Sequence, residues 1–97
     1  MSYGFHPAAE AEHLESVAFF ESKRPGLGAS YLAEFERIMR TVCEAPPRFP
    51  VEKQPDVRRV RMKRFPFAGL FREASGGVQV LAVAHSRRRP QYWLGRL

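Results

Sequence analysis

Apolar and polar residues repeat with two different periods along the chain, and the change of period divides it into two parts. In residues 31–42, apolar side chains recur at intervals of three and four with charged side chains between them, which is typical of an amphipathic helix. From residue 57 onward the period falls to two, the spacing of strands with one buried face. A helical part followed by strands predicts an α+β domain, in which a helical pair covers one face of an antiparallel sheet.

The helical part is predicted to begin with a short strand at Tyr3 to Phe5. A first helix follows at Pro7, because proline suits a position whose N–H would have no partner, and Pro25-Gly26 ends it. Helical spacing over residues 7–24 predicts one apolar, buried face and one acidic, solvated face. The buried face is expected to hold Ala11, Leu14, Val17 and Ala18, and the solvated face Glu10, Glu12 and Glu15.

The second helix, over residues 31–42, is followed by a proline-rich segment up to residue 56, which is predicted to be an extended connector. Three strands are predicted over residues 57–65, 67–74 and 78–85, with a hairpin turn at residues 75–77. Residues 86–97 form a basic, aromatic tail. The predicted order is therefore β-α-α-β-β-β with a short C-terminal tail, in a single domain over residues 1–97.

Length and composition limit the classes of protein to which the chain can belong. Ninety-seven residues, 44% of them hydrophobic, are enough for one core and too few for two. The apolar runs are far shorter than the ~20 residues that span a bilayer, and no signal-peptide pattern precedes them, so we expect a cytoplasmic protein without membrane contact. Cys43 is the single cysteine and no Gly-rich phosphate loop is present, so no metal or other cofactor is expected.

Charge is distributed unevenly along the chain. Residues 1–56 contain six Lys or Arg and nine Asp or Glu, a net charge of −3, whereas residues 57–97 contain ten Lys or Arg and only Glu73, a net charge of +9; together these give the formal charge of +6. A segment this basic creates a strong local potential for an anionic partner. RNA, DNA and an acidic protein segment all fit, and a solvated basic surface without a partner is the remaining alternative.

The candidate binding residues lie in this basic half. Arg59, Arg61 and Lys63 share one face of the predicted strand, at a spacing of about 6.5–7 Å that roughly matches successive phosphates of a single nucleic-acid strand. His85 ends the last predicted strand, where its first expected role is a structural hydrogen bond at the strand end; the alternative is a proton-transfer or phosphate-binding group. The tail adds cations beside aromatic rings, a combination that binds phosphates and stacks on unpaired bases; these residues are Arg87, Arg88, Arg89, Tyr92 and Trp93. For Tyr92 and Trp93, closure of the core is the alternative role.

Three motifs resemble the RelE/ParE superfamily of toxins when they are taken in order. They are RRVRMKRFPF at residues 58–67, GVQVLAVAH at 77–85 and RRRPQYW at 87–93. A Pro-Ala-Ala-Glu helix start, Gly26-Leu27-Gly28 between the helices and the proline-rich loop extend the resemblance over nearly the whole chain. It implies a toxin of a type II toxin–antitoxin system, with roles in growth inhibition and plasmid stabilisation. The implied partner is a small acidic antitoxin that folds on the toxin as a helix or an added strand.

The resemblance implies two mechanisms. RelE-like members cleave mRNA on the ribosome; for that activity, Arg61, Lys63, Arg87 (or Arg88) and Tyr92 match the family's catalytic pattern. Ala68 stands where that pattern has an arginine on the next strand, and Arg72, on the same side of the strand, is the candidate to replace it. ParE-like members inhibit DNA gyrase without those residues, and the Ala68 departure favours this mechanism. A non-toxic basic binding module with the same fold is the third hypothesis.

Overall fold

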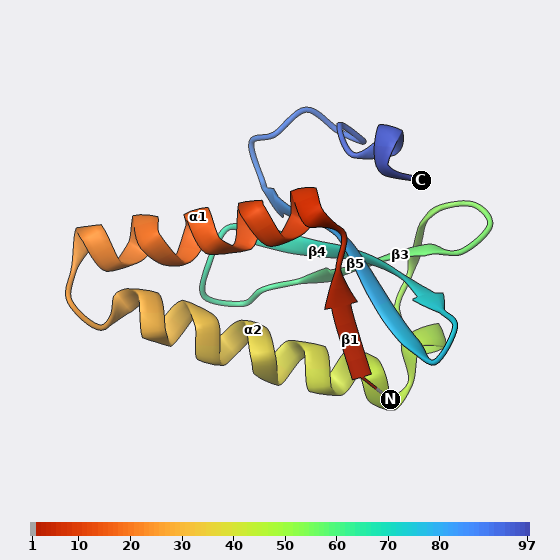
Figure 1. The fold of residues 1–97 in the computed structure, drawn as a ribbon, viewed down its shortest axis with the longest axis horizontal. Helices are drawn as coiled ribbons and strands as arrows, with labels where there is room; N and C mark the ends of the chain where they lie inside the picture. The colour runs from red at the N-terminus through yellow and green to blue at the C-terminus, as the bar shows by residue number, and fades with distance from the viewer. Residues whose placement is uncertain (1) are drawn as a thin grey trace.

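The structure, a computed structural model, describes residues 2–97 and places two long helices on one side of a five-stranded sheet (Figure 1). The α+β class and the order of the helices and main strands agree with the prediction. The elements in chain order are β1 (Ser2–Phe5), α1 (Pro7–Lys23), α2 (Leu27–Glu44), the 3-10 helix η1 (Pro46–Arg48), β2 (Val51–Lys53), β3 (Val57–Arg61), β4 (Phe67–Ala74), β5 (Gly77–His85) and the 3-10 helix η2 (Leu94–Arg96).

The sheet has the strand order β1-β5-β4-β3-β2 and differs from the prediction in two ways. It is mixed and not purely antiparallel, because β1 runs parallel to β5 while the other pairs are antiparallel. The proline-rich segment is also not only a connector: Val51–Lys53 pairs with the start of β3 as a short edge strand. Prolines flank this strand and do not interrupt it, so its ladder can form.

A tight connection joins α1 and α2 into a hairpin. Gly26 has a φ of 89°, a left-handed conformation that glycine adopts at little cost. The Glu21 carboxylate accepts hydrogen bonds from the N–H groups of Gly26 and Gly28 at 3.0–3.1 Å, and so satisfies donors at the start of α2. A Cβ at residue 28 would lie 2.6 Å from the carbonyl oxygen of Val17, so a glycine there lets the helices approach closely.

The buried face of α1 is not the one predicted. Of the four residues predicted to be buried, only Val17 packs against the core, and Leu14 is 61% exposed; the buried residues are Ala9, His13 and Ser16. Small residues let α1 pack closely on β5 and α2, and the bulk between the layers comes from elsewhere: the His13 ring lies 4.5 Å from the ring of Phe35 and 5.1 Å from that of Phe5. The spacing of apolar residues along α1 therefore predicts the wrong buried face, because the packing of α1 depends on how its side chains fit the neighbouring aromatic rings.

Two clusters of buried side chains lie on the two faces of the sheet. The larger one, under the helices, includes Phe35, Met39 and Phe71. The second lies on the helix-free face, where Trp93 of the tail covers residues such as Leu70 and Leu81. No helix within residues 2–97 is long and apolar enough to cross a membrane.

Strand β3 ends earlier than predicted, at Arg61 instead of residue 65. The chain then turns toward β4, and Glu34 of α2 holds this turn. One oxygen of its buried carboxylate accepts hydrogen bonds from the N–H groups of Lys63 (2.8 Å) and Arg64 (3.1 Å). A carboxylate 29 residues away in sequence thus takes the donors that a longer strand would have used.

Burial of His13 predicts that the protein loses stability in mild acid. Burial lowers the pKa of His13 below its usual value of 6.5, and the opposing charges of Glu36 and Glu10 do not restore it. The unfolded chain therefore binds the proton more readily than the folded one, so the stabilisation is complete above pH 6.5 and is lost as the pH falls toward the folded pKa. Urea unfolding at pH 7.5 and 5.5 should show this fall. A His13→Leu variant should lose less stability between these two pH values. An equal loss in both proteins would show that His13 is not the cause.

Candidate functional site

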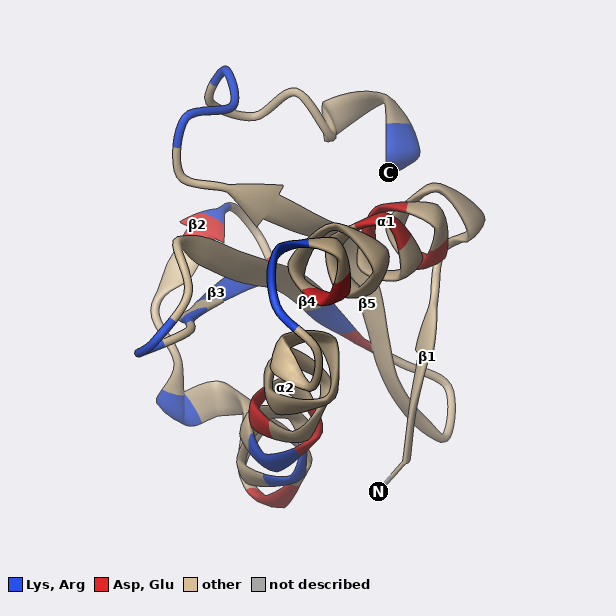
Figure 2. Ribbon diagram, turned by 90° about the vertical axis from the view of Figure 1, so that its left-hand side faces the viewer, with Lys and Arg blue, Asp and Glu red and all other residues tan. Residues whose placement is uncertain are grey.

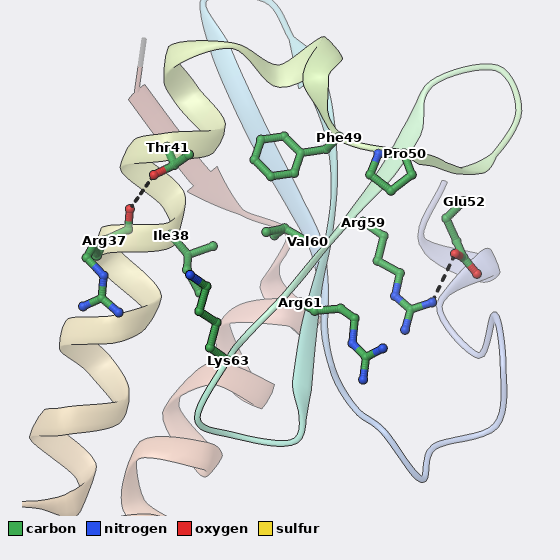
Figure 3. Close-up of a pocket in the computed structure, with 10 residues that line it drawn as sticks. All are labelled: Arg37, Ile38, Thr41, Phe49, Pro50, Glu52, Arg59, Val60, Arg61 and Lys63. Atoms are coloured by element: carbon green, nitrogen blue, oxygen red, sulfur yellow. Dashed lines mark hydrogen bonds and ion pairs between the residues drawn. The ribbon is translucent and has the colours of Figure 1, made fainter.

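The helix-free face of the sheet carries two of the three cations predicted to form a row, Arg59 and Arg61. Arg59 pairs with Leu70 and Arg61 with Ala68 across the β3–β4 ladder, so both arginines lie on the side where the second core forms. Val60, between them, belongs to the core under the helices. Figure 3 shows the two arginine side chains directed away from α2 and Val60 directed toward it. The alternation expected for Arg59 and Arg61 is thus present.

Lys63 and Arg72 lie apart from this pair. Lys63 follows the end of β3, and its side chain is directed toward α2, opposite to Arg61 (Figure 3). Arg72 is on the same face as Ala68 but about 13 Å further along the strand, given its rise per residue. Its Nε donates a hydrogen bond to the Gln79 side chain at 3.3 Å. Arg72 is therefore too distant to fill the place beside Ala68.

The tail brings most of the other predicted residues to this face. A small cavity of about 160 Å³ is lined by residues that include Arg59, Ala68, His85, Arg88, Arg89, Tyr92 and Trp93. His85 Nδ1 accepts a hydrogen bond from the Arg87 N–H at 3.0 Å, and the Arg88 guanidinium lies 3.9 Å from the centre of the Tyr92 ring. Arg87 itself is exposed and does not line the cavity.

A network centred on Glu12 holds the tail, and helical spacing does not predict it. Glu12 was assigned to a solvated face, but its carboxylate accepts four hydrogen bonds. Arg96 donates two of them, both at 2.9 Å, the Tyr92 hydroxyl one at 2.8 Å, and the Val83 N–H one at 3.0 Å. Arg96 also donates to the carbonyl of Leu81 at 3.0 Å. The one sequence signal was that Glu12 lies a single turn from Ala9 and Ser16, on what proves to be the buried side.

This network sets the chemistry of its members. Burial raises the pKa of Glu12, but hydrogen bonds from Arg96, Val83 and Tyr92 outweigh that effect, so its net pKa lies below 4.5. Burial and the contact with the Glu12 carboxylate raise the pKa of Tyr92. The Tyr92 hydroxyl is therefore a bound hydrogen-bond donor, a state ill suited to accepting a proton. Trp93, which is 2% exposed, lies in the second core and not on the surface.

A groove between α2 and β3 is the largest cavity described in the structure, with a volume of about 650 Å³. The helices leave it open because α1 packs on β5 and α2 contacts β1, so both helices lie toward the β1 edge of the sheet and leave β3 less covered. Its floor is apolar, formed by Ile38, Phe49 and Val60, and cations surround it (Figure 3). We call it the α2–β3 groove; it is lined by Arg37, Ile38, Thr41, Phe49, Pro50, Glu52, Arg59, Val60, Arg61 and Lys63.

Acidic and basic residues occupy different parts of the molecule. Figure 2 shows Asp and Glu mainly on the helices, whereas Lys and Arg lie on β3 and the tail and also on α2 and the connection between the helices. Near the groove, Glu52 lies 3.6 Å from Arg59, in a partly exposed ion pair of the kind that contributes little to stability. Within residues 2–97, no group of three His, Cys, Asp or Glu side chains is placed to hold a metal ion.

Comparison with known proteins gives a likeness at the level of structure. No protein-family model and no curated protein matches the chain. Among solved structures, it is similar to a chain of a "Chromosomal ParDE TA system from P. aeruginosa", with a TM-score of 0.74 and 17% sequence identity, over 88% of this chain and 95% of that one. The chain shares the ParE-like α+β fold of that structure. The RelE/ParE-type architecture expected from the sequence motifs is thereby confirmed for the helical hairpin and the sheet.

The Glu12 network of this ParE-like fold is expected to be essential for stability. Glu12→Gln keeps the size of the side chain but removes the charge that pairs with Arg96, and hydrogen bonds to charged groups contribute about 1.5–3 kcal/mol each. We expect the free energy of unfolding to fall by at least about 2 kcal/mol. Glu15→Gln, an exposed change one turn further along α1, should alter it by less than about 0.5 kcal/mol. Denaturant titration of both variants checks this, and equal stabilities would contradict it.

Proposed function

We propose that this protein is the toxin of a type II toxin–antitoxin pair, that it acts in the cytoplasm by inhibiting DNA gyrase, and that a cognate antitoxin neutralises it. The observation that carries the proposal is the ParE-like fold, which spans most of both chains in the comparison with the P. aeruginosa ParDE system. The cations of β3 and the tail, of which only Arg59 and Arg96 form ion pairs within residues 2–97, add a surface that would attract an anionic target or partner.

The arrangement of the candidate catalytic residues favours gyrase inhibition over mRNA cleavage. A nuclease would need cations converging on one phosphate and a free proton-transfer group. Arg61 and Lys63 are directed to opposite sides of the sheet, and the Tyr92 hydroxyl donates to Glu12. Ala68 leaves the place opposite Arg61 without a cation, and the Arg72 guanidinium is bound to Gln79. A RelE-like nuclease is therefore the less favoured hypothesis.

We further propose that the antitoxin places an acidic, amphipathic helix in the α2–β3 groove. The apolar floor of Ile38, Phe49 and Val60 would take the apolar side of such a helix. Arg37 and Lys63, which border the floor on the side of α2, would pair with its carboxylates. A volume of about 650 Å³ is ample for several side chains of a docked helix.

Inhibition assays with the purified protein test the target. We expect the protein to inhibit DNA supercoiling by gyrase and to leave cell-free translation intact. Arg61→Ala and Tyr92→Phe should leave translation unchanged, since neither is expected to act in mRNA cleavage. Cleavage of ribosome-bound mRNA that falls by about 10²-fold or more in Arg61→Ala would favour the nuclease instead.

Charge reversal tests the groove. Lys63→Glu should weaken antitoxin binding about tenfold or more, mainly through repulsion of an acidic helix, and the effect should shrink at high salt. Arg24→Glu makes the same change of charge at the exposed connection of the helical hairpin, away from the groove, and should have little effect. Titration calorimetry with the protein from the neighbouring reading frame measures both. Equal weakening by the two variants would indicate attraction by net charge alone and would overturn the assignment to this groove.

A further inference from the structure

A second cavity, of about 350 Å³, lies between α1 and the end of β5 and is separate from the α2–β3 groove. Aromatic rings form much of its wall: Phe19 and Phe20 of α1, and Phe67 at the start of β4. Phe19 is 53% exposed, and the Lys23 ammonium lies 4.9 Å from the centre of its ring, so the ring already makes a cation–π contact. The volume lies at the lower end of the range for small-molecule sites.

One end of this cavity is suited to an anion. His85 lines it, and because the Nδ1 of His85 accepts the Arg87 N–H, the proton of the neutral ring is on Nε2, which is free to donate. Arg88 also lines the cavity; its guanidinium stacks on Tyr92 and forms no ion pair within residues 2–97. A stacked guanidinium is held in place while its N–H groups remain available.

The other end is polar and comes from α1. Glu15 and Ser16 line it, and the Glu15 carboxylate is exposed. A carboxylate accepts hydrogen bonds and donates none, so it selects groups that present N–H donors. Glu12 also borders the cavity, but Arg96, Tyr92 and Val83 already occupy its oxygens.

We propose that this cavity binds a mononucleotide, with the base against the rings of Phe19 and Phe67 and the phosphate at His85 Nε2 and Arg88. Flat aromatic walls, a cationic end and a carboxylate are what a planar base, its phosphate and its amino groups require. Glu15 favours bases with N–H groups on their edge, so guanine binds better than uracil. The site shares no residue with the α2–β3 groove, so binding of a nucleotide can be tested separately from binding of the antitoxin.

Chemical-shift titration of the whole protein tests this site, with guanosine 5′-monophosphate as the probe. We expect shifts confined to α1, His85 and the tail, with a Kd of about 1 mM or tighter. Phe19→Ala should weaken binding about tenfold through lost stacking. Arg88→Gln should weaken binding of guanosine 5′-monophosphate but not binding of guanosine, which lacks the phosphate. Arg61→Gln removes a cation outside the cavity and should change neither.

Three results would overturn the proposal. Absence of shifts at saturating monophosphate would refute binding. Inorganic phosphate producing the same shifts, with none from guanosine, would show a simple anion site. Shifts with a short single-stranded RNA but none with the mononucleotide would assign the surface to a polymer. Equal affinities for guanosine and uridine monophosphates would show that Glu15 does not select the base. Tighter binding of guanosine monophosphate would support its role in selection.

Discussion

The carboxylate of Glu12 lies where α1, β5 and the tail meet, and its hydrogen bonds connect all three. Strand β1 ends at Phe5, opposite Val80, so the rest of β5 has no neighbouring strand on that side. Glu12 accepts the N–H of Val83, and Arg96 donates to the carbonyl of Leu81, so two side chains replace the missing strand. Because the same carboxylate binds Arg96 and Tyr92, satisfying the strand edge also fixes the tail.

Fixing the tail has consequences on the other face of the sheet. Tyr92 and Trp93 are adjacent in sequence, so the hydrogen bond from Tyr92 to Glu12 helps to keep Trp93 over Leu70 and Leu81. The helix-free face is thereby partly covered by an apolar side chain, and the cations that remain are distributed around it. A sheet with helices on one face usually leaves the other to solvent; here the last residues of the chain form a second core instead.

The sequence predicted the parts of the fold that depend on local periodicity and missed those that depend on distant partners. The apolar stripe of α2 and the alternation around Val60 follow directly from burial on one side, and both are present. The role of Glu12 was not predictable in this way, because its partners lie 71–84 residues further along the chain. Lys63 was misplaced for the same reason: Glu34, 29 residues earlier, ends the strand before it. Helical spacing also failed for α1, where Leu14 faces outward and small residues make the contact.

The electrostatic character of the molecule follows from how few of its cations are paired. Among the ten Lys and Arg of residues 57–97, only Arg59 and Arg96 form ion pairs within residues 2–97. The Arg96 pair is mostly buried and serves stability, whereas the Arg59 pair is partly exposed and weak. The acidic residues that could have neutralised the others lie mainly on the helices. Folding therefore leaves the positive charge of β3 and the tail uncompensated, and this favours an anionic partner that approaches from that side, at a rate that falls as the salt concentration rises.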